Sequence, residues 1–483
     1  MFNKSTIESK MNVDIAMSNA MSNHIALCKQ VHENKAPWIN NKTVFSSNTA
    51  AGIASEVARL VTLEFKSEIS NNNFLNEEYQ AVIKNIRNYT QFACATGGLV
   101  FKPYVSGKHI EVDFTQADAF YPVSFNSRGE VTAAIFIETK TEGDTTYTRL
   151  EYHSMEKITE DGKEIDVCMI RNTAFKKKNY NQVLNSNSDS LGDEIPLSEV
   201  EEWSNLQPQT SIKNVDRLLF GYFKIPLANT IDSSSPLGVS IYSSIVEPNG
   251  LLQQIDEQYS RILWEYKSKE TAIHVDRDLL KNSSYDDSLY MPIGMERLYR
   301  NVDIDMSSTG SKQIDVYSPD IRDISLFNGL NELYRQAEFQ CGLSYGTLSR
   351  VEDTAKTATE IKASKQRMYQ NVKDIQKSLE TALKDLVYAM NVWSVLAGLD
   401  NKIVNVNSEI SFDFDDSIIT DADKENDSMF LDVSSGFIKP IYYIMKKYKV
   451  TEKEAAEMMA DTQDSINDNN LDKNINPTTG LPS

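Results

Sequence analysis

The sequence predicts an α+β protein that is predominantly helical. Apolar residues recur at helical spacing in the first part of the chain, and the spacing changes to two in residues 99–170. Later, one apolar stripe continues without Gly or Pro from Thr357 to Gly398. With 483 residues, the chain is long enough for about two to four folding units.

Three helices are predicted near the start of the chain. Residues 10–31 and 50–69 carry apolar side chains at steps of three and four, which favours an amphipathic helix in each. A third helix is predicted over residues 77–96. It ends at Gly97 and Gly98, which are suitable helix stops.

An antiparallel sheet is predicted for residues 99–170. Ile110, Val112 and Phe114 alternate with acidic residues, as in a strand with one buried face. Residues 126–130 (NSRGE) and 142–144 (EGD) supply the turn chemistry of hairpins.

The middle of the chain mixes helix and short strands. Residues 239–268 are predicted to be helical, with an interruption near Pro248 and Gly250. Residues 274–320 contain strand-like pieces at 298–302 and 313–317, which indicates a small inserted module.

The strongest periodic signal comes next. A helix is predicted from Leu326 to Cys341, and Gly342 and Gly346 interrupt it. A second helix begins near Thr357, where Glu360 completes a capping box, and at about 40 residues it would be about 60 Å long.

A strand-like segment is predicted at residues 411–414, and an acidic helical stretch near Asp421. The tail from residue 465 is rich in Asn, Asp, Pro and Gly, which favours disorder.

The composition excludes two broad classes of protein. The formal net charge is −20, so the chain cannot bind nucleic acid over its whole surface, which would require an excess of cations. Hydrophobic residues make up 40% of the chain, too many for wholesale disorder. No run of about 18 apolar residues occurs and the start does not resemble a leader, so we expect a soluble chain with no membrane segment.

The sequence predicts no catalytic, metal or cofactor site. Its four cysteines are far apart, which indicates a reduced compartment and no structural zinc. Glu151 and His153 share a strand face, either as a catalytic pair or as part of an exposed face. A calcium loop starting at Asp421 fails because Asn426 stands where glycine is required, and no phosphate-binding loop is present.

A basic cluster stands out from the acidic background around the start of the long helix. Two interpretations are open: a solvated helix face with local ion pairs, or a basic ring that faces a polyanion. The cluster consists of Arg350, Lys356, Lys362, Lys365, Arg367 and Lys373.

Six segments, in this order and spacing, resemble a known family. They are KAPWINN (35–41), IASEVARLVTLEFKSEIS (53–70), ACATGGLVFKPYV (93–105), NTIDSSSPLGVSIY (229–242), CGLSYGTLSRVEDTAKTATEI (341–361) and FDDSIITD (414–421). The chain resembles the portal proteins of tailed double-stranded-DNA bacteriophages, of the siphophage type that infects Gram-positive bacteria.

The resemblance implies a non-enzymatic ring, usually dodecameric, at one capsid vertex. Viral DNA would enter the head through its channel during packaging and leave through it at ejection. The implied partners are further copies of the chain, double-stranded DNA, the terminase large subunit, the major capsid and scaffold proteins, and the head–tail adaptor. The implied location is the virion, with assembly in the host cytoplasm.

The resemblance also implies a layout. A wing would occupy residues 1–240, and 241–272 would lead from it into a first stem helix. The later regions would be a clip (273–322), a second stem helix (323–341), a tunnel-loop region (342–358), a long helix (359–400), a crown (401–464) and a disordered tail (465–483).

Within this layout, two sets of residues are candidates for function. A ring of acidic subunits repels DNA broadly, which favours a local contact at the basic cluster. The DNA-facing candidates are Arg350, Lys356, Lys362 and Lys365. The stripe of the long helix would pack between subunits, and its candidates are Ile361, Met368, Val372, Ile375 and Leu379.

Two alternatives remain open. One is a soluble cytoplasmic metal-assisted hydrolase with a helical accessory domain, which would use Asp413, Asp415 and Asp416. The other is a different phage head or connector component with a shared helical core.

Overall fold

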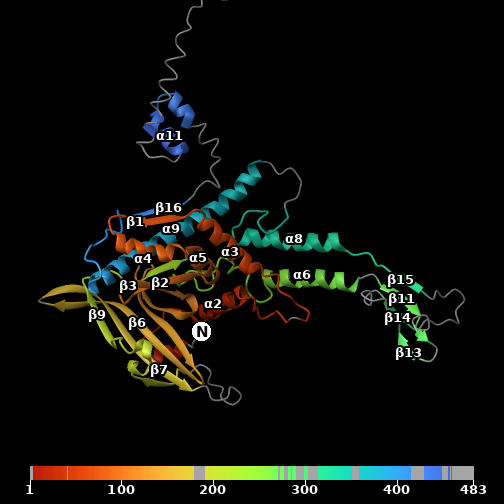
Figure 1. The fold of residues 1–483 in the computed structure, drawn as a ribbon, viewed down its shortest axis with the longest axis horizontal. Helices are drawn as coiled ribbons and strands as arrows, with labels where there is room; N and C mark the ends of the chain where they lie inside the picture. The colour runs from red at the N-terminus through yellow and green to blue at the C-terminus, as the bar shows by residue number, and fades with distance from the viewer. Residues whose placement is uncertain are drawn as a thin grey trace, which may run out of the picture. The chain divides into compact units, whose positions relative to one another are not determined.

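The computed structural model divides into two units, Met1–Phe414 and Asp415–Ser483 (Figure 1). The structure describes most of the chain, but not all of it. The described residues are 4–40, 42–160, 162–178, 191–269, 272–276, 281–283, 286–289, 299–302, 314–350, 358–414, 429–448, 455–456 and 458. Among them, no helix combines the length and the apolar character needed to cross a bilayer.

Five helices come first in the described chain, where three were predicted. They are α1 (Lys4–Met11), α2 (Asn19–His32), α3 (Thr49–Val61), α4 (Asn73–Ile83) and α5 (Ile86–Thr96). The single helix predicted over residues 10–31 is wrong, because the chain turns at Asn12 with a φ of 53°. Ser18 then caps α2 by accepting a hydrogen bond from the Met21 N–H at 3.2 Å.

The other two N-terminal helix predictions also need correction. The helix predicted over residues 50–69 ends at Val61, and after Glu64 with its φ of 48° the chain becomes strand β1 (Lys66–Ile69). The helix predicted over residues 77–96 is divided at Asn85, which has a φ of −108° and a ψ of 6°. Asparagine competes poorly for helix interiors, so the break falls there.

Two antiparallel sheets form where one sheet region was predicted, and they continue past residue 170. One has three strands: β2 (Gly98–Ser106), β3 (His109–Gln116) and β10 (Gly221–Lys224). The other contains β4 (Phe120–Phe125), β5 (Val131–Glu142), β6 (Thr145–Glu160), β7 (Lys163–Lys178) and β8 (Asp193–Ile195), with β9 (Gln209–Lys213) also paired to β7. Short 3₁₀ turns are η1 (Ala117–Ala119), η2 (Leu197–Glu199) and η3 (Glu201–Trp203).

The long helix α9 (Ala358–Leu396) confirms the strongest sequence prediction and packs on β2 and β10. A Cβ at Gly221 would lie 2.1 Å from the carbonyl oxygen of Ala382, so β10 approaches α9 at a distance that only glycine allows. The buried face of α9 joins the largest apolar core of the first unit.

Strand β16 (Ile410–Asp413) pairs antiparallel with β1, with Lys66 opposite Asp413. The predicted strand at residues 411–414 is therefore confirmed. Val404 also lies in the core of the first unit, so residues 401–414 fold with that unit.

Helices α6 (Leu251–Ser268) and α8 (Asp323–Gln340) lie side by side (Figure 1). The predicted helix over residues 239–268 begins only at Leu251, because turns occupy the segment with Pro248 and Gly250. Gln258 donates a hydrogen bond to the Leu326 carbonyl at 3.2 Å, and Glu265 pairs with Arg322 at 3.1 Å. The two helices are therefore antiparallel.

Short strands lie between these two helices in the sequence, which confirms the strands predicted at residues 298–302 and 313–317. Strand β11 (Ala272–Asp276) pairs in parallel with β14 (Tyr299–Val302) and antiparallel with β15 (Ile314–Tyr317). Strands β12 (Lys281–Ser283) and β13 (Asp286–Leu289) pair antiparallel with each other.

The described part of the second unit contains helix α11 (Pro440–Tyr448). The ring of Tyr443 contacts that of Phe430 at 6.0 Å. The acidic helix predicted near Asp421 and the tail predicted to be disordered, residues 465–483, lie outside the described residues.

Candidate functional site

The segment that follows α8 is fixed in place by glycines and one asparagine. Gly342 has a φ of 68° and Gly346 a φ of 91°, so both take left-handed conformations that end the helix. The side chain of Asn371 in α9 donates a hydrogen bond to the Gly342 carbonyl at 3.3 Å. The predicted interruption at these glycines is confirmed, and it brings the segment against α9.

A buried carboxylate holds the next turn of this segment. Glu338 is fully buried, and its Oε1 accepts hydrogen bonds from the N–H groups of Gly346, Leu348 and Ser349 at 3.1, 2.6 and 2.8 Å. Its Oε2 accepts a hydrogen bond from the Ser349 hydroxyl at 2.8 Å. Four donors satisfy the charge, so Glu338 acts as an anchor for residues 346–349.

Arg350, a DNA-facing candidate, comes directly after this anchor. Its N–H donates a hydrogen bond to Oδ1 of Asn331 at 2.7 Å, and its exposed guanidinium lies 5.0 Å from the ring centre of Phe327. Both partners belong to α8. The backbone of Arg350 is therefore fixed, and its charge stays accessible to solvent.

The other three DNA-facing candidates belong to or precede α9. Lys365 is exposed. Lys362 is in the first turns of the helix, where the structure describes the backbone and not the side chain, and Lys356 lies outside the described residues. The structure thus places two of the four cationic groups, Arg350 against α8 and Lys365 on α9.

Two further arginines stack on aromatic rings beside the same segment. Arg367 of α9 lies 4.7 Å from the ring centre of Phe339, and Arg335 of α8 lies 5.7 Å from that of Tyr345. Arg335 was not in the predicted cluster. It could have been found from its position on α8, about two turns before the glycine-rich segment.

Glu338 was also missed by the sequence analysis. A lone glutamate in an amphipathic helix is typical of a solvated face. The available signal was its spacing, because Glu338 follows Leu330 and Tyr334 in steps of four and therefore falls on the apolar side of α8.

The five subunit-packing candidates have different surroundings in α9. Val372, Ile375 and Leu379 are buried in the core of one chain, so their apolar surface is already covered without a second copy. Met368 is partly exposed, and the side chain of Ile361 is not described. A subunit contact at Met368 or Ile361 stays a prediction.

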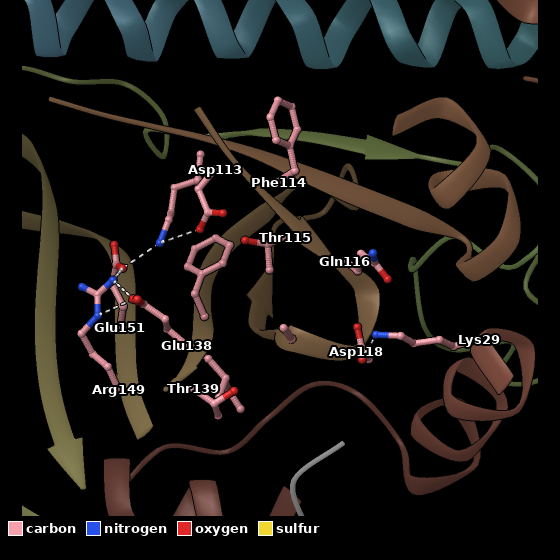
Figure 2. Close-up of a pocket in the computed structure, with 14 residues that line it drawn as sticks. Lys29, Asp113, Phe114, Thr115, Gln116, Asp118, Glu138, Thr139, Arg149 and Glu151 are labelled. Carbon is pink, nitrogen blue, oxygen red and sulfur yellow. Dashed lines mark hydrogen bonds and ion pairs between the residues drawn. The ribbon is translucent and has the colours of Figure 1, made fainter. Parts of the chain in front are cut away.

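A second polar site is a cavity of about 320 Å³ between β3, β5 and β6. Figure 2 shows Arg149 between Glu138 and Glu151, and Lys29 reaching Asp118 elsewhere in the same cavity. Lys102 pairs with Glu151 at 2.7 Å.

His153 pairs with Glu151 of this cavity at 2.7 Å, so the two residues do share a strand face as predicted. Burial raises the pKa of Glu151, but Lys102, His153 and Arg149 outweigh it and hold this pKa well below its usual range. His153 is only 2% exposed. The exposed-face interpretation of this pair is therefore wrong, and the arrangement is a buried ionic network that joins β2 to β6.

A metal-assisted hydrolase would need a cluster of side chains that bind a metal ion. Among the described residues, no three His, Cys, Asp or Glu side chains converge as metal ligands would. Of the three candidate ligands, Asp413 pairs with β1 in the sheet, and Asp415 and Asp416 lie outside the described residues.

Comparison with known proteins identifies the class. The family model described as "Phage portal protein, SPP1 Gp6-like" matches residues 41–469. Because the match covers most of the sequence, the chain belongs to this family of phage portal proteins, and its mixed helices and sheets are the portal fold. The comparison gives no support to a hydrolase. No curated protein sequence matches the chain significantly.

Two solved structures are similar over most of their length. A chain of "Neck of native GTA particle computed with C12 symmetry" has 10% identity and a TM-score of 0.38, covering 88% of this chain and 93% of its own. A chain of "Virion of native gene transfer agent (GTA) particle" has 9% identity and a TM-score of 0.39, covering 90% and 96%. At these TM-scores neither likeness adds to the assignment, which rests on the family match.

Proposed function

We propose that this portal protein assembles into a closed ring of twelve copies at one vertex of a phage head. Double-stranded DNA passes through the ring during packaging and ejection. The observation that carries the proposal is the family match over residues 41–469. A closed ring needs a head-to-tail contact between copies, and an axial channel follows from its rotational symmetry.

The described elements support an assignment of regions. Helices α6 and α8 form the stem, and the strands between them in sequence, within residues 273–322, form the clip. The segment fixed by Glu338 begins the tunnel-loop region at 342–358, and α9 is the long helix. The wing takes residues 1–240. The crown takes 415–464 of the second unit, because residues 401–414 fold with the first unit.

Charge determines where the proposed channel repels DNA and where it contacts it. Each copy carries a net charge of −20, so twelve copies carry on the order of −240, which repels DNA from most of the surface. Exposed cations next to residues 342–350 then form a local band, in which Arg350 and Lys365 contact phosphates as DNA slides past. Few contacts per copy keep the affinity low and the sliding resistance small.

The proposed role is structural. ATP hydrolysis belongs to the terminase large subunit, which docks at the clip. The other proposed partners are the major capsid and scaffold proteins and the head–tail adaptor. In this proposal the protein assembles in the host cytoplasm and remains in the virion.

The proposal is tested in cells that express the full set of phage head proteins with and without this chain. Heads made with the chain should contain DNA protected from nuclease, and heads made without it should contain none. Equal amounts of protected DNA in both would contradict the proposed role.

A further inference from the structure

A groove of about 410 Å³ lies beside α6, on the side formed by the loop of residues 42–45. Its lining combines two aromatic residues with three cations and one acid: Phe45, Trp264, Lys42, Arg261, Lys267 and Glu257. Trp264 is 65% exposed, and Arg261 and Lys267 are exposed on the same helix. An exposed tryptophan flanked by cations is typical of a binding surface and unusual for solvent-facing helix.

The loop that forms the other wall is held rigidly. Oδ1 of Asn40 accepts hydrogen bonds from the N–H groups of residues 42, 43 and 44 at 3.0, 2.8 and 3.0 Å. The Phe45 N–H donates to the buried Ser260 hydroxyl at 2.8 Å, and Lys267 lies 5.4 Å from the ring centre of Phe45. The groove is therefore preformed, which lowers the entropy that a bound partner must overcome.

The buried carboxylate of Asp256 fastens the segment that continues on both sides of this loop. Its Oδ2 accepts a hydrogen bond from the Trp38 ring at 2.9 Å, and its Oδ1 accepts one from the Ser47 N–H at 2.7 Å. Both ends of the wall are thus tied to α6.

The beginning of α8 carries the complementary surface. Ile324 is 73% exposed, and Asp320 and Asp323 are exposed on either side of Arg322. An apolar side chain with two acids here matches an aromatic side chain with two cations in the groove.

These two surfaces lie at the same level of the helix pair. Glu265, next to Trp264, pairs with Arg322, and the Tyr266 ring lies 6.4 Å from that of Phe327. Rotation about a ring axis preserves height along that axis, so residues that meet between copies must start at equal heights. Trp264 and Ile324 fulfil this condition when the helix pair lines the channel.

We propose that the groove beside α6 binds the beginning of α8 from a second copy of this chain. Trp264 packs on the neighbour's Ile324, and Arg261 and Lys267 face its Asp320 and Asp323. In the proposed contact, which rests on the proposed ring, each copy offers its groove to one neighbour and its α8 surface to the other, so the contact is head-to-tail.

The test uses two full-length variants, Trp264→Asp in the groove and Ile324→Asp on α8. Both side chains are exposed, so circular dichroism and the thermal midpoint should match those of the wild type. Each variant alone should remain at 54.6 kDa. An equimolar mixture should form dimers of twice that mass, about 109 kDa, because one intact groove meets one intact α8 surface and no further copy can add.

A charge exchange tests the same contact by the recovery of ring assembly as well as by its loss. Arg261→Asp should abolish rings, and the double variant Arg261→Asp with Asp323→Arg should restore them. The milder Trp264→Ala should raise the half-assembly concentration by about 30-fold. Leu206→Asp, which changes an exposed apolar residue of the wing region, is the matched control and should leave rings intact.

The outcomes for the wild type and the two aspartate variants separate the groove contact from the ring itself. If the wild type forms rings and both aspartate variants do too, the groove contact is wrong and the ring stands. If each variant is monomeric but their mixture gives no dimer, these two surfaces do not bind each other. If the wild type itself forms no ring, the proposed function fails.

Discussion

The carboxylate of Glu338 accepts hydrogen bonds from both the N–H and the hydroxyl of Ser349. This contact joins the last turns of α8 to the start of the proposed tunnel-loop region, 11 residues further along the chain. Arg350 follows directly, so the position of a DNA-facing candidate depends on a residue that is itself fully buried.

Glu338→Gln should release residues 346–349 from α8. One of the two acceptor oxygens becomes an N–H donor that faces other donors, and leaving such buried groups unmatched costs about 1–3 kcal/mol. Hydrogen exchange of the Leu348 and Ser349 amides should accelerate by about 5- to 150-fold if the loop opens locally. Glu332→Gln, at an exposed position of the same helix, is the control and should leave exchange unchanged.

Leu379→Ala should destabilise the single chain. Leu379 is fully buried in the core of the first unit, and removing such a side chain from a packed core costs about 2–5 kcal/mol. Chemical denaturation of the chain under conditions that keep it monomeric measures this loss. Lys377→Ala, on the exposed side of α9, should change stability little. Equal effects of the two substitutions would contradict the placement of α9.

Glu151 should make stability depend on pH in the acid range. Its folded-state pKa lies well below the ordinary value of 4.5, so the stabilisation is complete above about pH 4.5 and is lost as the pH falls through the folded value. Glu151→Gln leaves Lys102 and Arg149 without their shared partner, which costs about 3–5 kcal/mol at neutral pH.

The difference in thermal midpoint between wild type and Glu151→Gln should therefore shrink from about pH 6 to about pH 3. Glu164→Gln, at an exposed carboxylate of β7, should track the wild type throughout. A constant difference for Glu151→Gln over this range would show that the charge of Glu151 is not what stabilises the network.

Lys365→Ala should weaken the interaction of assembled rings with a short DNA duplex. Each lost phosphate contact lowers the slope of log affinity against log salt by about 0.9. Fluorescence anisotropy over a salt series measures that slope. Arg128→Ala removes an exposed cation from the turn between β4 and β5, in the wing region, and should leave the slope unchanged. The same slope in both variants would remove Lys365 from the DNA path.

Local signals were enough to predict much of the fold. The long helix α9, the antiparallel strands and the helix break at Gly342 follow from periodicity and from the conformations glycine permits. The division of the N-terminal helices at Asn12 and Asn85 was missed, because apolar spacing continues across both turns.

Long-range pairing could not be predicted from the sequence. Helical spacing continues into strand β1, and the strand's partner β16 is more than three hundred residues away, so the sequence predicts a helix there. The burial of Glu338 depends in the same way on a loop that folds back over α8. Val372, Ile375 and Leu379 carried a clear apolar signal, but spacing cannot distinguish a core within one chain from a contact between chains.

The mass and shape of the purified full-length chain test the proposed ring most directly. The proposed ring would give particles of twelve copies of 54.6 kDa, about 655 kDa, whose end-on image averages show an axial hole. A single species of 54.6 kDa at every concentration, with no hole in any particle, would contradict it.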